Sequence, residues 1–242
     1  MDNIKKFYKY KIKYENLVSQ LGSADNLTKQ LIILTVPHSK CIENLNVHVC
    51  DFGALKCAKI ISEKLSGDQN ETIILEANIN RTILDLNRIK SFNSDYRTKL
   101  RSTVIDKIKE NEKLDIKNKN RIIYIIDCHS FPDKTNDFSN VRIKNPDVAI
   151  LMASCYQLNY AEEMTDILHE LGISATKHLG NGNDIIEEFY SVNQKLKFGY
   201  NTIIIPLLLE FNEGLSDNKI KIIGTGIGEW IESINKFSNE VA

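Results

Sequence analysis

The sequence predicts an α/β fold of three layers, in which a mixed, mostly parallel sheet is flanked by helices. Short, continuous apolar runs are typical of strands that are buried on both faces, as in sheets covered by helices on each side. Four such runs occur, at residues 30–36, 121–126, 147–154 and 201–211. Segments with apolar residues at helical spacing lie between them. With 242 residues and 42% hydrophobic content, the chain can bury a substantial core, and we expect one domain over residues 1–242.

Composition narrows the range of partners. The formal net charge is −1, and acidic and basic residues are interspersed, so we expect no binding to nucleic acid or to an anionic membrane. Five cysteines without paired spacing indicate reduced thiols. The N-terminus has no apolar signal core, and no run reaches membrane-spanning length. These features predict a cytoplasmic location.

The first apolar run, Gln30–Val36, stops at Pro37, His38 and Ser39. In an open α/β sheet, ligands bind at the carboxyl ends of strands, so His38 is a candidate metal ligand or acid/base. Asp51 then precedes a segment with helical apolar spacing and occupies the position of an N-cap. It is either a cap, which contributes roughly 1 kcal/mol, or a carboxylate directed back at His38, and both roles are compatible.

A strand at residues 72–77 leads into the motif Asn-Arg-Thr-Ile-Leu-Asp-Leu-Asn-Arg at residues 80–88. Arg81 and Arg88 flank its apolar positions, and a guanidinium near a core must find an anion because it cannot lose its proton. The two arginines suggest a pocket for a carboxylate. The alternative is a pair of internal salt bridges with Asp85.

A helix at residues 93–111 separates this motif from the strand at 121–126, which is followed directly by Asp127, Cys128 and His129. A second histidine thus stands just past the carboxyl end of a strand. Histidines that bind metals usually donate their other N–H to a carboxylate or a carbonyl. Asp127, two residues away on the same strand face, is a candidate for that role or for holding the loop.

The last third of the chain continues the alternation of strands and helices. We predict a strand at 147–154, a helix at 161–171 that Gly172 ends, a strand at 173–178, a helix up to about residue 195 and a final helix at 227–237.

The apolar run at 201–211 contains Pro206, which predicts an edge strand or a bulge. It also contains Glu210 near its end. A lone buried carboxylate is costly, so Glu210 must be paired, bound to a metal or partly protonated.

Together these polar positions form the set that a zinc hydrolase needs. Two imidazoles and a carboxylate can hold zinc with one position left for water, and a further carboxylate can take the water's proton. Guanidinium groups can polarise a carbonyl and bind a carboxylate.

The motifs resemble those of the N-formylglutamate amidohydrolases, relatives of the zinc carboxypeptidases and aspartoacylases. The resemblance covers roughly residues 31–212, and its most specific element is Arg81 followed by Asp85-Leu86-Asn87-Arg88. The other matching segments are Pro37-His38-Ser39, Asp51-Phe52-Gly53-Ala54, Asp127-Cys128-His129-Ser130 and Leu208-Leu209-Glu210-Phe211-Asn212.

The resemblance implies a zinc carboxypeptidase-like fold, a Zn²⁺ cofactor and a small carboxylate substrate similar to N-formylglutamate. It implies the following roles: zinc ligands His38, Asp51 and His129; general base Glu210; carbonyl polarisation by Arg81; and binding of the substrate carboxylate by Asn87 and Arg88. Glu43, five residues after His38, is the alternative to Asp51, because carboxypeptidases take their acidic ligand a few residues after the first histidine.

Two residues depart from the family pattern. Lys40 stands where the family commonly has glycine and could bring an ammonium close to the metal, and the thiol of Cys128 could face the core or shift the metal preference. These departures leave two other functions open: a carboxypeptidase or amidase that acts on peptide or cell-wall material, and a non-catalytic binding protein with the same fold.

Overall fold

A six-stranded sheet forms the centre of the computed structural model, which describes residues 30–40, 51–67, 70–113, 121–131, 145–180, 184–196 and 202–240. The strands are ordered β2-β1-β3-β6-β4-β5 across the sheet. Every neighbouring pair is parallel except β4 and β6, which are antiparallel. The predicted mixed, mostly parallel sheet is confirmed. The strands are β1 (Gln30–Val36), β2 (Asn70–Glu76), β3 (Arg121–Phe131), β4 (Val148–Met152), β5 (Ala175–Leu179) and β6 (Thr202–Asn212).

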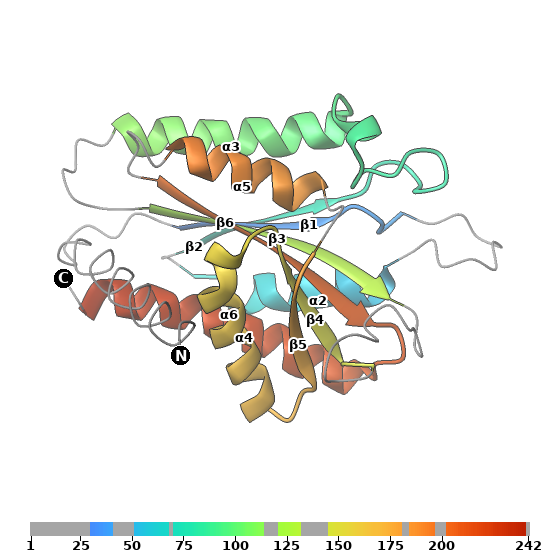
Figure 1. Cartoon of the computed structure of the whole chain (residues 1–242). Coiled ribbons are helices and arrows are strands. Elements are labelled where there is room, and N and C mark those ends of the chain that lie inside the picture. The colour runs from blue at the N-terminus through green and yellow to red at the C-terminus, as the bar shows by residue number, and fades with distance from the viewer. Residues whose placement is uncertain are drawn as a thin grey trace, which may run out of the picture.

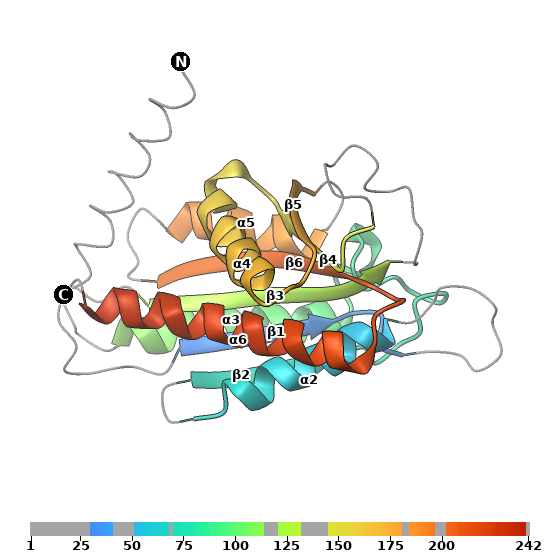
Figure 2. The ribbon, with the colours of Figure 1, turned by 90° about the horizontal axis from the view of Figure 1, so that it is seen from below.

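Helices cover both faces of this sheet, which confirms the three layers. Helices α3 (Asp95–Lys113) and α5 (Asp184–Leu196) lie on one face. The other face is covered by α2 (Phe52–Lys64), α4 (Leu158–Glu170) and α6 (Asp217–Glu240), as Figures 1 and 2 show. Each face has its own buried apolar cluster, as expected for strands that are apolar on both sides. No helix in the described residues has the length and apolar character to cross a membrane.

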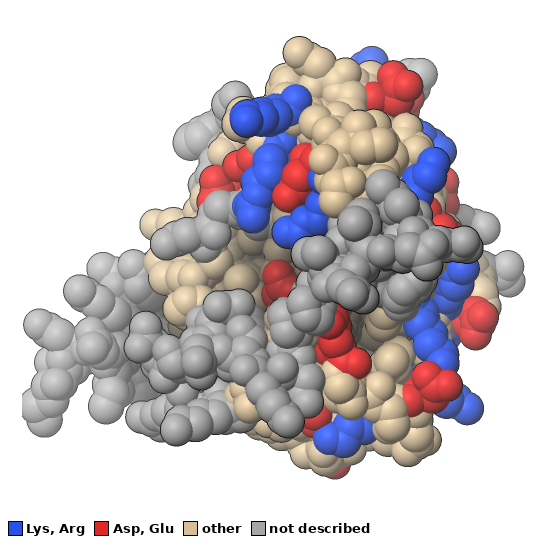
Figure 3. Space-filling model, turned by 90° about the vertical axis from the view of Figure 1, so that its right-hand side faces the viewer, with Lys and Arg blue, Asp and Glu red and all other residues tan. Residues whose placement is uncertain are grey.

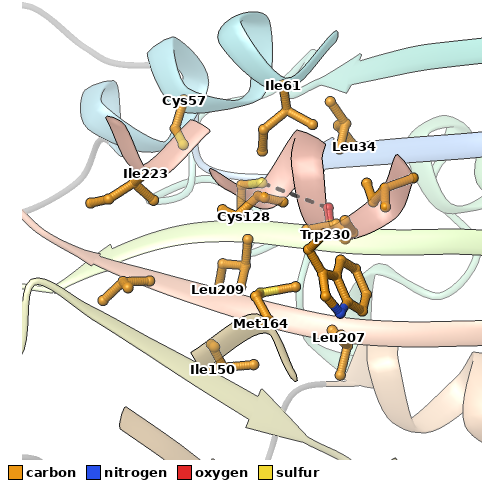
Figure 4. Packing of buried hydrophobic residues seen from close by; sticks show 14 of the residues in the cluster. Leu34, Cys57, Ile61, Cys128, Ile150, Met164, Leu207, Leu209, Ile223 and Trp230 are labelled. Carbon is orange, nitrogen blue, oxygen red and sulfur yellow. Dashed lines mark hydrogen bonds between the residues drawn. The ribbon is translucent and has the colours of Figure 1, made fainter. Parts of the chain in front are cut away.

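The thiol of Cys128 belongs to the core between the sheet and helices α2 and α6. It is fully buried beside apolar residues of β1, α2 and α6, and its Sγ lies 3.7 Å from the carbonyl oxygen of Ile126 (Figure 4). Successive side chains of a strand point to opposite faces, so Cys128 points away from the face that carries Asp127 and His129. Of the two possibilities considered for this thiol, a place in the core or an effect on the metal, the structure therefore shows the place in the core.

Pro206 lies in a central strand, so the prediction of an edge strand or a bulge was wrong. Its pairing with β3 is in continuous register, with Ile125 opposite Pro206. The Pro206 carbonyl accepts a hydrogen bond from the side chain of Gln157, which follows β4. The N–H and C=O of one strand residue point to the same side of the strand. The missing N–H of Pro206 would therefore point to the side on which β4 lies, at a position where β4 no longer pairs with β6. Proline therefore removes no bond of the sheet.

Several element boundaries also differ from those predicted. Strand β3 continues through Phe131 because its polar end pairs with β6 up to Asn212, so His129 lies inside the strand rather than after it. Helix α6 begins at Asp217, ten residues before the predicted start at residue 227. The expected end of α4 is confirmed, since Gly172 adopts a φ of 76°, a conformation that favours glycine.

Candidate metal centre

Three elements bring His38, Asp51 and His129 together. His38 lies in the turn after β1, Asp51 directly precedes α2, and His129 lies in β3. Strands β1 and β3 are parallel neighbours, with Thr35 opposite Asp127, so their carboxyl ends meet at one edge of the sheet. A backbone hydrogen bond of 3.1 Å from the Asp51 N–H to the His38 carbonyl draws the start of α2 to the same place. All three side chains are buried.

The three potential ligand atoms are almost equidistant. His38 Nδ1 lies 3.2 Å from Asp51 Oδ2 and 3.2 Å from His129 Nδ1, and His129 Nδ1 lies 3.3 Å from Asp51 Oδ2. Zinc bonds of about 2.0–2.1 Å to nitrogen and oxygen, arranged as a tetrahedron, separate neighbouring ligand atoms by about 3.3–3.4 Å. Two imidazole nitrogens and one carboxylate oxygen are also a donor set that zinc accepts. The residues present therefore fit a zinc ion with one position left open.

Asp51 occupies the N-cap position of α2, yet its side chain makes no capping hydrogen bond. Its carboxylate turns towards the two histidines instead, and Ser130 Oγ donates to the second oxygen, Oδ1, at 3.1 Å. Burial raises the pKa of Asp51, but the hydrogen bonds with His129 and His38 outweigh this effect and leave the pKa below its ordinary value. Of the two roles considered for this side chain, only the one directed at His38 is present. Glu43, the alternative ligand, lies outside the described residues.

Each histidine contacts a carboxylate through Nε2, the ring nitrogen that does not face the other two residues of the group. His38 Nε2 lies 2.8 Å from Asp85 Oδ1, and His129 Nε2 lies 2.9 Å from Asp127 Oδ2. Thr35 Oγ1 in turn donates to the other oxygen of the fully buried Asp127 at 2.5 Å. Such partners fix the ring orientation and the tautomer of metal-binding histidines. The geometry fits the orienting role considered for Asp127. The contact of Asp85 with His38 was not foreseen, because in the sequence Asp85 stood out only as an arginine partner.

These carboxylates also affect the charge of His129. Burial lowers its pKa, but the charge of Asp127 and the hydrogen bonds with Asp127 and Asp51 raise the pKa well above its ordinary value. The raised pKa favours the imidazolium form without a metal, and a zinc ion bound at Nδ1 would displace the proton of that nitrogen.

We expect replacement of Asp127 by asparagine to lower zinc affinity by roughly 10–100-fold, the range seen when an orienting partner of a ligand is lost. The neutral amide holds the His129 N–H more weakly and does not make the ring more basic. A zinc titration against a competing chelator measures the change. Asp217→Asn, which removes an exposed carboxylate paired with Lys56, is the control and should leave the affinity unchanged. Equal affinities in the two variants would refute the role of Asp127.

Asp85 also forms ion pairs with both arginines of the motif. Arg81 Nε and Arg88 Nε lie 3.5 Å and 3.7 Å from Asp85 Oδ2, and the Asn87 N–H donates to Asp85 Oδ1 at 3.0 Å. The ion pairs considered as an alternative are thus present. Both arginine side chains nevertheless stay partly exposed, so Asp85 holds them at the edge of the site rather than burying them.

Asn87 is buried between Asp85 and the second histidine. Its Nδ2 lies 3.2 Å from His129 Nε2, while its Oδ1 has no hydrogen-bond partner among the described residues. A buried amide with an unsatisfied end is costly, so a ligand that forms a hydrogen bond with this amide would be favoured.

Glu210 lies beside the metal centre without joining it. In the sheet it is directly opposite His129, but it is not among the three residues whose ligand atoms converge. Burial raises the pKa of Glu210 to about 7, the charges of Asp51 and Asp127 act in the same direction, and those of His129 and Arg81 oppose them. A carboxyl group with a pKa near neutrality can both accept and release a proton at physiological pH.

The ammonium of Lys40 does not contact the three converging residues. Its Nζ donates to the carbonyl of Asn78 at 2.9 Å, just beyond the end of β2. Figure 3 views the molecule from the side to which β1 and β3 direct their carboxyl ends, where acidic and basic side chains border a hollow.

Comparisons with known proteins find similarity in structure only. No protein-family model and no curated protein matches the sequence. A gene product of Agrobacterium tumefaciens aligns with a TM-score of 0.52 and 16% identity, over 84% of this chain and 91% of that one. The D,L-carboxypeptidase of Helicobacter pylori in its mDAP-bound form aligns with a TM-score of 0.50 and 10% identity, over 88% of this chain and 54% of that one.

The family that the motifs resemble is also among the structural neighbours. An N-formylglutamate amidohydrolase from Ralstonia eutropha aligns with a TM-score of 0.48 and 10% identity, over 85% of this chain and 96% of that one. Metallo-carboxypeptidases and an aminoacylase 3 are further neighbours. At these identities the similarity concerns the fold. The predicted carboxypeptidase-like architecture is confirmed at that level by the D,L-carboxypeptidase, and by a putative carboxypeptidase A from Shewanella denitrificans that aligns with a TM-score of 0.52 and 12% identity, over 88% of this chain and 59% of that one.

Proposed function

We propose that this protein is a zinc-dependent amidohydrolase that cleaves an N-formyl or N-acyl amide of a substrate with a carboxylate. The observation that carries the proposal is the set of three ligand atoms from His38, Asp51 and His129, spaced 3.2–3.3 Å apart and supported from behind by Asp85 and Asp127. A structural zinc site has four protein ligands, whereas a catalytic site has three and keeps one position for water or substrate. In the part of the chain that the structure describes, three potential ligands lie beside a separate acid, which favours catalysis.

In this proposal the substrate is held by the motif at residues 81–88. Arg88, with Asn87, binds the substrate carboxylate, and Arg81 lies closer to the scissile carbonyl, where its charge stabilises the oxyanion. Asp85 keeps both guanidinium groups beside the site through ion pairs with their Nε atoms.

Proton transfer is assigned to Glu210. His38, Asp51 and His129 would hold zinc, which supplies the Lewis acidity that makes water nucleophilic near neutral pH. The Glu210 carboxylate accepts a proton from the attacking water and delivers it to the leaving amine nitrogen. Its raised pKa matches a group that must do both.

The test is a hydrolysis screen of protein whose metal content has been measured. The panel pairs N-formyl and N-acetyl amino acids that carry a side-chain carboxylate with the corresponding amides, and adds short peptides. We expect about one zinc per chain and amine release from the carboxylate-bearing N-acyl compounds. A chelator should abolish this release and added zinc should restore it. Cleavage of peptides alone would indicate a carboxypeptidase, and zinc binding without any hydrolysis would indicate a binding protein.

A further inference from the structure

Arg97 of α3 is a buried cation that the proposed mechanism does not use. Its side chain is only 1% exposed, and its guanidinium must find acceptors because it cannot lose its proton. Nη2 pairs with the Glu188 carboxylate of α5 and donates to the Asp184 carbonyl at 3.1 Å. Nη1 donates to the Leu86 carbonyl at 3.3 Å. Arg97 thus connects α3, the first turn of α5 and the segment that carries the arginine motif.

The contact with Leu86 falls between two residues that face the metal centre. Asp85, on one side, orients His38 and holds the two arginines, and Asn87, on the other, contacts His129. The same α5 turn binds this segment a second time, because the Asp184 N–H donates to the Asn87 carbonyl at 3.4 Å. The segment is therefore held from behind while its side chains reach the site in front.

Residues 85–88 contain no regular helix or strand. Their conformation depends on individual contacts, and the turn bonds within the segment account for only some of them. A buried ion pair is by itself weak evidence for stability, because desolvation offsets much of its Coulomb energy. This pair differs from other ion pairs because its arginine also donates a hydrogen bond to the backbone carbonyl of Leu86, in the centre of the motif.

We propose that the Arg97–Glu188 pair is a positioning device that fixes the backbone at Leu86 and so sets where Asn87 and Arg88 meet the substrate carboxylate. This inference rests on the proposed function for its effect on substrate. The pair touches neither substrate nor zinc, so its loss should weaken substrate binding and leave the zinc ligands in place.

The test compares Arg97→Lys with Arg101→Lys in the zinc-loaded protein. Lysine keeps the charge at position 97 but cannot reach Glu188, Asp184 and Leu86 at once. Arg101 is the matched control because it also pairs with Glu188, at 3.4 Å, but donates to Phe92 and Thr98 rather than to Leu86. If Arg97→Lys does not fold, Glu188→Gln takes its place, since it removes the charge and keeps an acceptor.

Hydrogen exchange of the peptide covering residues 84–90, which excludes the Arg101 partner Phe92, is the first readout and requires no substrate. We expect exchange there to accelerate in Arg97→Lys and not in Arg101→Lys, with equal zinc content. KM for the carboxylate-bearing substrate should rise roughly tenfold in Arg97→Lys only, with kcat changed little, since a small displacement of a binding group is costly.

Unchanged exchange in this peptide, or faster exchange spread evenly over the chain with KM unaltered, would overturn the positioning role. If no substrate is found, the proposed function fails, and the exchange comparison still decides whether Arg97 holds this segment.

Discussion

Replacing His129 with alanine is expected to remove zinc from the protein. The change deletes one of the three proposed protein ligands among the described residues, and the remaining pair, His38 and Asp51, cannot define a tetrahedral site. Zinc sites with four protein ligands have apparent binding free energies of about 10–16 kcal/mol, so loss of one ligand should weaken affinity by roughly two to three orders of magnitude. Elemental analysis after dialysis measures the result directly.

The variant also leaves Asp127 buried without its imidazole partner, so its folding must be checked by circular dichroism. Arg88→Ala is the control, because it removes a side chain that is partly exposed and absent from the ligand set. It should keep zinc and chiefly raise KM, as expected when a residue that binds the substrate carboxylate is lost. A folded His129→Ala protein with full zinc content would refute His129 as a ligand.

The convergence of His38 and His129 was predictable from the sequence because of a simple property of parallel sheets. Residues that follow neighbouring parallel strands must lie at the same edge, so His38 and His129, 91 positions apart, could be expected to meet. The apolar runs were sufficient to locate β1 and to place β3 and β6, because strands buried on both faces leave a continuous signal.

Features that depend on neighbours across the sheet could not be predicted in the same way. The polar end of β3 does not look like a strand, and only its pairing with β6 makes it one. Pro206 is tolerated in a central strand because the pairing of β4 with β6 ends at Leu208, so no partner is left for the N–H that proline lacks. The local sequence does not show where this pairing ends. The contact of Asp85 with His38 depends on how a turn without regular structure is folded, which contacts with α3 and α5 help to determine.

The side chain of Asp51 illustrates a competition that sequence patterns do not resolve. An aspartate before a helix normally accepts a hydrogen bond from the first turn. Here two buried imidazoles offer partners to the same carboxylate, and the Ser130 hydroxyl satisfies its other oxygen. Hydrogen bonds from these groups evidently exceed the roughly 1 kcal/mol that a cap contributes.

Replacing Glu210 with glutamine is expected to keep zinc and to lower turnover by roughly two to four orders of magnitude, the contribution of a positioned proton carrier. Glutamine has nearly the same shape but cannot accept the proton of the attacking water. It also leaves the ligand set of His38, Asp51 and His129 unchanged, so metal content should not vary. The measurement is kcat together with zinc content for the substrate that the screen identifies.

Glu213→Gln is the matched control for that substitution. Glu213 lies three residues further along the chain and is exposed, and its Oε1 lies 3.2 Å from Ser130 Oγ. If Glu210 carries the proton because it faces the centre from within β6, the control should retain most of its turnover. A large loss in Glu213→Gln with normal turnover in Glu210→Gln would reassign the proton carrier, because both changes replace a carboxyl group of β6 or its following turn with an amide of nearly the same shape.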